Sequence, residues 1–336
     1  MDLAGEIVGG WVDFFVDLFG GSSPEPARWQ EPRAYRSYNS FASLAAQDVE
    51  NFSESSADRV TFLSFARSGA EIRAGLLGVR DHGRDEWIGV GEIEEARRAV
   101  GNRQIDALII SIGGNDIGFA GSLTDLVIKD LLAWNPVGND SKERAKTRKK
   151  VEQKLENELP QALDDLKRAI DKELAPRQVY ILEYPTGLFE KTGPDGKVED
   201  GGPCGIFASS LDMDLDVNDG QAIKALGKKL NALIRDKAQQ FGWVFVSGIE
   251  AGFAGHGYCD DQTFFVGAEE SCRNQGDFEG TMHPNQLGHQ VYREQLVQAL
   301  RLHLFQQAWL EPVLSTMLGT TPTGSWLEPV LNVTMR

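Results

Sequence analysis

Short runs of β-branched and other apolar residues alternate along the chain with longer segments in which apolar residues recur every three or four positions. The runs have the length and composition of fully buried strands, and the longer segments have the period of amphipathic helices. Strands are predicted at Val60–Phe65, Ala107–Ile112, Val179–Glu183 and Trp243–Val246. This alternation predicts an α/β fold, a three-layer αβα sandwich with a central parallel sheet.

The helices predicted between these strands are Phe41–Val49, Ile93–Val100, Ser141–Leu174, Asp219–Phe241 and Gln286–Gln307. The helix from Ser141 to Leu174 is dense in Lys, Arg, Glu and Asp, so we interpret it as a solvated flank that Pro160 bends. We predict one domain over residues 1–308, with a helical insertion at about 120–175 and a long loop at about 186–220 that is rich in Gly, Pro and Asp.

Residues 309–336 are predicted to form a C-terminal tail, in which the hexapeptide Trp-Leu-Glu-Pro-Val-Leu occurs at Trp309–Leu314 and again at Trp326–Leu331. Two copies do not make a solenoid. Two interpretations stay open: the apolar residues of the tail pack on the body of the protein, or the tail is a docking peptide for another chain.

Charge and hydropathy exclude several partners. The formal net charge is −16 and the pI about 4.8, so the surface should repel the phosphates of nucleic acid and anionic lipid headgroups. No stretch approaches the roughly 20 apolar residues that span a bilayer, so no integral membrane segment is expected. The first basic residue is Arg28, and the sequence as written therefore predicts no secretory signal peptide.

The three cysteines, Cys204, Cys259 and Cys272, are too few for a disulfide scaffold. Cys259 and Cys272 flank a short segment rich in Gly and Asp, and we predict a disulfide between them. The alternative is that both are free, half-buried thiols.

One buried strand runs directly into a polar turn, Gly113-Gly114-Asn115-Asp116. Ligands of parallel sheets bind at the carboxyl ends of the strands, where Asn115 would lie. The NH₂ group of an asparagine in this position donates to an oxyanion that develops in a transition state. The alternative is a simple tight turn, since Gly and Asn favour left-handed conformations.

A second segment with catalytic potential is Thr281-Met282-His283-Pro284-Asn285, placed just before the last predicted helix. The proline and asparagine keep His283 on the loop, and a loop histidine with a pKa near 6.5 suits a general base. His289 would lie on the helix, where a packing or capping role is the better interpretation.

The order of these segments resembles the SGNH (GDSL-like) hydrolase family, in its bacterial esterase and lipase-like branch. The segment Val60–Ala70 looks like the glycine block of the family, Gly113–Asp116 like its Gly-x-Asn-Asp block, and His283–His289 like its last block. The resemblance implies a serine ester hydrolase with His283 as base and an oxyanion hole made of the Gly69 N–H and Asn115. It implies no metal or organic cofactor, an ester of a small molecule, lipid or glycan as substrate, and a secreted or periplasmic location.

Two departures from the family pattern concern the catalytic machinery. The acid of the triad should stand three residues before the histidine, where this chain has Gly280, so a backbone carbonyl, Asp277 or Glu279 would have to replace it. No Gly-Asp-Ser occurs, and the best substitute for the nucleophile is Ser22, which follows an apolar run.

Ser22 can act only if Trp11–Phe19 is the first central strand of the sheet, yet this segment also has the pattern of an amphipathic helix. The chain is therefore either an ester hydrolase or a truncated or degenerate SGNH domain that binds or scaffolds without catalysis. A metal-dependent phosphoesterase is disfavoured because the sequence lacks a compact cluster of His and Asp ligands.

Overall fold

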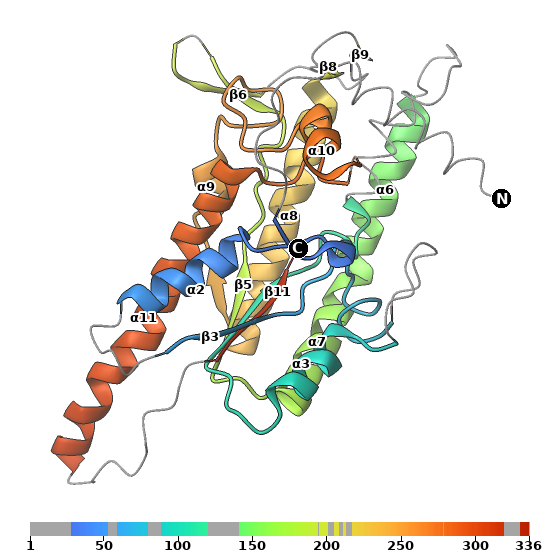
Figure 1. The fold of residues 1–336 in the computed structure, drawn as a ribbon. Helices are drawn as coiled ribbons and strands as arrows, with labels where there is room; N and C mark the ends of the chain where they lie inside the picture. The colour runs from blue at the N-terminus through green and yellow to red at the C-terminus, as the bar shows by residue number, and fades with distance from the viewer. Residues whose placement is uncertain are drawn as a thin grey trace.

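Five parallel strands form the central sheet, in the order β10-β5-β4-β11-β3 (Figure 1). The strands are β3 (Thr61–Ser64), β4 (Ala107–Ser111), β5 (Gln178–Leu182), β10 (Val244–Val246) and β11 (Val330–Met335). The computed structural model describes residues 28–52, 59–79, 89–119, 141–193, 195–200, 205–207, 211–212, 217–277, 279–318 and 330–335. The predicted α/β fold with a parallel sheet is confirmed.

The four predicted strands all belong to this sheet, and each end differs from the prediction by no more than one residue. β11 was not predicted as a strand. It pairs with two neighbours at once, since Val333 is opposite Ser64 of β3 and opposite Ile109 of β4. Part of the predicted tail is thus a central strand, and the structure gives no support to docking of another chain through it.

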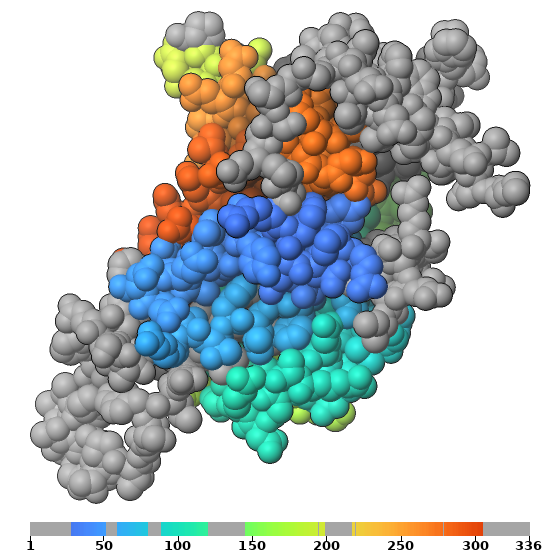
Figure 2. All heavy atoms as spheres, in the orientation of Figure 1, coloured from blue at the N-terminus to red at the C-terminus, as the bar shows by residue number. Residues whose placement is uncertain are grey.

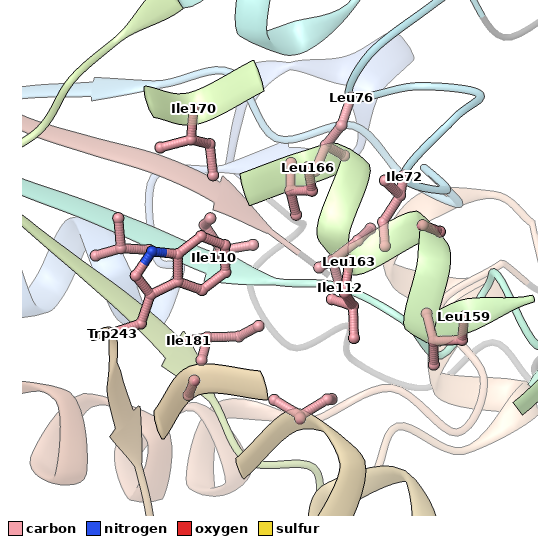
Figure 3. Close-up of a cluster of buried hydrophobic side chains, with 14 of the residues drawn as sticks. Ile72, Leu76, Ile110, Ile112, Leu159, Leu163, Leu166, Ile170, Ile181 and Trp243 are labelled. Carbon is pink, nitrogen blue, oxygen red and sulfur yellow. The ribbon is translucent and has the colours of Figure 1, made fainter. Parts of the chain in front are cut away.

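One face of the sheet is covered by α3 (Glu92–Val100), α6 (Ser141–Asn157), α7 (Leu159–Glu173) and α8 (Val217–Phe241). Leu159, Leu163, Leu166 and Ile170 repeat at helical spacing along α7, and Figure 3 shows them directed toward Ile110 and Ile112. Burial of such a stripe is the main favourable term that holds a helix against a sheet.

The other face is covered by α2 (Phe41–Phe52), α9 (Ile249–Phe253) and α11 (Gln286–Leu318). β4 contributes side chains to the cores on both faces of the sheet. Ala107 and Ile109 pack with α2, α9 and α11, while Leu108 and Ile110 pack with α3, α6, α7 and α8. Successive side chains of a strand point to opposite faces, so a central strand must be apolar throughout.

The helical prediction needs three corrections. The predicted helix Ser141–Leu174 is two helices that meet at Glu158, since Pro160 lies in the first turn of α7, where a proline is tolerated. α11 continues to Leu318, so the first copy of the hexapeptide is helical. α8 begins at Val217, and the predicted loop before it contains two short antiparallel pairs, β6 (Glu190–Thr192) with β7 (Val198–Asp200) and β8 (Gly205–Phe207) with β9 (Leu211–Asp212).

The remaining described elements lie near the carboxyl edge of the sheet or connect to it: β1 (Trp29–Glu31), the 3₁₀ turn η1 (Pro32–Ala34), β2 (Arg36–Ser37) and α10 (Ala268–Gln275). The cysteine prediction is wrong. Cys259 is disulfide-bonded, whereas Cys272 is a free thiol on the buried face of α10 and is 4% exposed. Cys204 lies outside the described residues.

Candidate functional site

Two loops leave the carboxyl ends of β3 and β4 and are hydrogen-bonded to each other. Asn115 Nδ2 donates to the Ala70 carbonyl over 3.1 Å, and Asp116 Oδ1 accepts from the Ile72 N–H at 2.9 Å. These bonds bring together the loops that carry Gly69 and Asn115, the two predicted oxyanion donors. Gly69 has a φ of 69°, a left-handed conformation that glycine adopts without strain.

Hydrogen bonds with three different segments hold the residues that precede Gly69. The Ala66 carbonyl accepts from Arg36 Nε at 3.1 Å, the Arg67 N–H donates to Glu92 Oε1 at 3.0 Å, and the Ser68 N–H donates to the Ala34 carbonyl at 3.1 Å. The Gly69 N–H itself makes no hydrogen bond with any residue that the structure describes. The loop therefore presents a fixed, half-buried turn with a donor at its centre.

The turn that carries Asn115 is supported from α8. The Gly114 N–H donates to Tyr184 Oη at 3.3 Å, and Asn231 of α8 holds the backbone of Tyr184 from both sides. Asn231 Oδ1 accepts from the Tyr184 N–H at 2.9 Å, and Asn231 Nδ2 donates to the Tyr184 carbonyl at 2.8 Å. This support was not predicted, although an asparagine on the apolar face of a predicted helix was a signal for it.

Asp116 is a structural carboxylate in this arrangement. Burial raises its pKa to about 6, against the lowering effect of the bond from Ile72. Lys154 Nζ of α6 donates to the Asp116 carbonyl at 3.2 Å. The Gly-Gly-Asn-Asp segment is thus held by α6 as well as by the Gly69 loop.

His283 lies three residues before α11, on a segment paired with residues 264–266. The Met282 N–H donates to the Val266 carbonyl, and the Val266 N–H donates to the His283 carbonyl, over 2.9 and 2.8 Å. Met282 has a φ of 62°, unusual for a residue with a side chain. Asn285 then caps α11, because its Oδ1 accepts from the N–H groups of Leu287 and Gly288. The backbone on both sides of His283 is therefore fixed.

The carboxylate of Asp277 does not bond to His283. It accepts from Tyr35 Oη at 2.5 Å, from Gln275 Nε2 at 2.7 Å and from the Glu279 N–H at 2.9 Å. The Gly280 carbonyl accepts from the His283 N–H at 3.1 Å, which is a backbone contact. Asp277 instead ties the histidine segment to Tyr35, whose neighbour Ala34 binds the Gly69 loop. Figure 2 shows the described N-terminal residues, in blue, lying against the orange segment that includes α10.

His289 has a capping role, as its position on the predicted helix indicates. Its Nδ1 accepts from the Phe41 N–H at 3.2 Å, at the start of α2. Burial lowers the pKa of His289 to about 4, so the ring is neutral near pH 7 and able to accept this bond.

The structure therefore brings only some of the predicted site residues together. Gly69 and Asn115 are side by side. His283 is connected to their loops through the bond between Asp277 and Tyr35, and no hydrogen bond joins it to either of them. Ser22 lies outside the described residues. Glu92 and Tyr35, which hold this edge together, gave no sequence signal beyond their polarity.

A pocket of about 360 Å³ lies away from these residues, lined by Glu183, Glu190, Lys224, Lys228 and Glu250 among others. Two of its ion pairs are within the lining, since Lys224 is 2.6 Å from Glu190 and Lys228 is 3.7 Å from Glu250, and Glu183 pairs with Arg235. Within the part of the chain that the structure describes, no group of three or more His, Cys, Asp or Glu side chains is arranged to hold a metal ion. No described helix has the length and apolar character needed to cross a membrane.

The sheet, its two helical layers and the loops at its carboxyl edge define an α/β protein whose polar motifs gather at one end of the strands. The chain belongs to the GDSL-like lipase/acylhydrolase family, whose family model matches residues 16–296. β11 lies beyond the matched residues. A lipase of Streptomyces rimosus is 30% identical over 158 residues, which cover 47% of this chain and 48% of the lipase. The matched part thus spans about half the length of that relative.

Two solved structures share the fold. The extracellular lipase of Streptomyces rimosus superimposes with a TM-score of 0.55 at 24% identity, covering 83% of this chain and 95% of the lipase. Phospholipase A1 of Streptomyces albidoflavus superimposes with a TM-score of 0.54 at 20% identity, covering 82% of this chain and 91% of that enzyme. At these identities the likeness concerns the arrangement of the chain.

Proposed function

We propose that this protein is an ester hydrolase in which His283 is the general base and the Gly69 N–H and Asn115 Nδ2 are the oxyanion donors. The bond from Asn115 to the Ala70 carbonyl carries the proposal, because it keeps the asparagine amide one residue from Gly69. A side-chain amide has two N–H donors, so Asn115 keeps a second one for a substrate oxygen. The substrate class is an ester of a small molecule, lipid or glycan, and the chemistry requires no metal or organic cofactor.

In this mechanism a serine hydroxyl, for which Ser22 is the candidate, attacks the ester carbonyl carbon while His283 takes its proton. The carbonyl oxygen becomes an oxyanion and accepts from Gly69 and Asn115. When the tetrahedral intermediate collapses, the C–O bond to the alcohol breaks and His283 returns the proton to the leaving oxygen. Water, deprotonated by His283, then attacks the acyl-enzyme and releases the acid and the free serine.

A second candidate function is a non-catalytic SGNH domain that binds an ester or glycan ligand. The placement of β11 favours it. A catalytic Ser22 requires Trp11–Phe19 to be the first central strand, whereas the described strand between β3 and β4 is β11. Trp11–Phe19 lies outside the described residues.

Turnover of a short-chain nitrophenyl ester distinguishes the ester hydrolase from the non-catalytic binding domain. For a hydrolase we expect His283→Ala to abolish turnover, while His256→Ala, which changes a histidine stacked on Phe264, leaves it intact. Asn115→Ala should lower kcat about 10²- to 10³-fold, the usual effect of losing one oxyanion donor.

A fluorophosphonate probe followed by peptide mass spectrometry would identify the nucleophile. Labelling of Ser22 that is lost in Ser22→Ala but kept in Ser23→Ala supports the mechanism. A folded protein that neither hydrolyses the ester nor reacts with the probe would refute the hydrolase and leave the binding domain.

A further inference from the structure

One of the three contacts that hold the loop before Gly69 comes from a buried acid of α3. Glu92 is 1% exposed, and its Oε1 accepts from the Arg67 N–H at 3.0 Å. Its Oε2 is also buried and has no hydrogen-bond partner among the described residues. An acid in such a place costs stability unless neighbouring charges or bonds compensate it. The position therefore calls for an explanation other than packing.

The start of α3 binds both the backbone and the side chain of Arg67. Its backbone N–H is bound to Glu92, while its guanidinium donates to the Val90 carbonyl at 2.9 Å and to Glu95. Gly91, between these acceptors, fits so tightly that an added Cβ would lie 2.4 Å from the Leu76 carbonyl. The start of α3 is thus fixed in place, and it fixes Arg67, two residues before Gly69.

We propose that Glu92 is a positioning residue, which sets the direction of the Gly69 N–H by holding the Arg67 N–H from the first turn of α3. The inference rests on the proposed function, since Gly69 is an oxyanion donor only if the protein hydrolyses esters. Because Glu92 is almost fully buried, we expect it not to contact the substrate. Its effect reaches the reaction through the left-handed turn at Gly69, which would rotate if Arg67 were released.

The charges that face Glu92 come from three segments: Arg36 of β2, Arg67 of the loop, and Glu95 on the next turn of α3. Burial raises the pKa of Glu92 to about 8, although both guanidinium groups act to lower it. Near pH 7 the carboxyl is therefore mainly protonated, and a glutamine is close to it in size, charge and accepting oxygen.

The test compares Glu92→Gln and Glu92→Ala with Glu94→Ala, also on α3, as the matched control. Glu92→Gln should keep wild-type kcat at pH 7. Glu92→Ala should lower kcat about 10- to 100-fold, less than outright loss of an oxyanion donor, with KM nearly unchanged because the donor acts on the transition state. Glu94→Ala removes only contacts with the exposed side chains of Arg97 and Arg98 and should leave kcat within about twofold.

Amide hydrogen exchange of residues 67–70 tests the positioning without any turnover. Exchange should accelerate in Glu92→Ala and stay at the wild-type rate in Glu92→Gln. If Glu92→Ala does not fold, Glu92→Asp, which is shorter by one CH₂ group, provides the same comparison. Unchanged exchange and kcat in the folded Ala or Asp variant would overturn the proposal. Altered exchange in a protein without esterase activity would instead refute the proposed function and keep the positioning role.

Discussion

Asn231 offers the sharpest stability prediction, because a single buried amide satisfies two backbone groups of Tyr184. Asn231 is 2% exposed, and Asn231→Leu keeps the size of the side chain while removing both hydrogen bonds. Each backbone group that loses its partner costs about 1–3 kcal/mol, or about 2–6 kcal/mol for the two. The leucine recovers about 1.5–3 kcal/mol through apolar burial. We expect a net loss of about 2 kcal/mol.

Urea unfolding followed by tryptophan fluorescence measures this loss, with Asn218→Leu on the exposed start of α8 as the control. The control should stay within about 0.5 kcal/mol of wild type. Because Tyr184 Oη accepts from Gly114, Asn231→Leu should also reduce the rate constant of any ester hydrolysis. A loss of stability below about 1 kcal/mol would show that water or a local shift replaces the amide, and would refute the argument.

Three further predictions concern other parts of the structure. Burial lowers the pKa of His289 to about 4 in the folded state, whereas the ring titrates near 6.5 when unfolded, so the unfolded chain binds this proton first and His289 lowers stability as the pH falls from about 6.5 to 4. His289→Gln should remove this contribution, so its urea midpoint should rise relative to that of wild type as the pH falls through this range, and a difference between the two midpoints that does not depend on pH would contradict it. Burial also raises the pKa of Cys272, so iodoacetamide should label it in urea and hardly at all in the native protein. Asn332→Pro should cost about 3 kcal/mol or more by removing an N–H from the centre of the sheet, and wild-type stability would argue against the pairing of β11.

The sequence was sufficient to predict the layers of the fold because they depend on local periodicity. Val60–Phe65 and Ala107–Ile112 have the continuous apolar character of buried strands, and their ends follow from the glycines and polar residues beside them. The adjacency of Gly69 and Asn115 was also within reach, since loops at the carboxyl ends of parallel strands share one edge.

The features that the sequence did not predict depend on contacts between residues that are far apart in the chain. β11 resembles a tail in the sequence, because it becomes a strand by pairing with β3 and β4. No local pattern in the sequence indicates that pairing. Cys259 and Cys272 are close in sequence, yet Cys272 lies on the buried face of α10 and takes no part in a disulfide. The contacts of Glu92 and Asn231 are with backbone groups, and almost any residue supplies such groups, so the sequence contains no matching partner to find.

β11 has a consequence for the order in which the protein is made. During synthesis β4, β5 and β10 emerge one after another and can pair with one another as they appear. β3 emerges before all of them but touches the sheet only through β11, from which more than half of the chain separates it. The edges of β3 and β4 that pair with β11 therefore stay unpaired until residues 330–335 have left the ribosome. Contacts so distant in sequence form slowly, and open strand edges invite association with other chains. The exit of residues 330–335 from the ribosome is the step at which we expect this sheet to close or to aggregate.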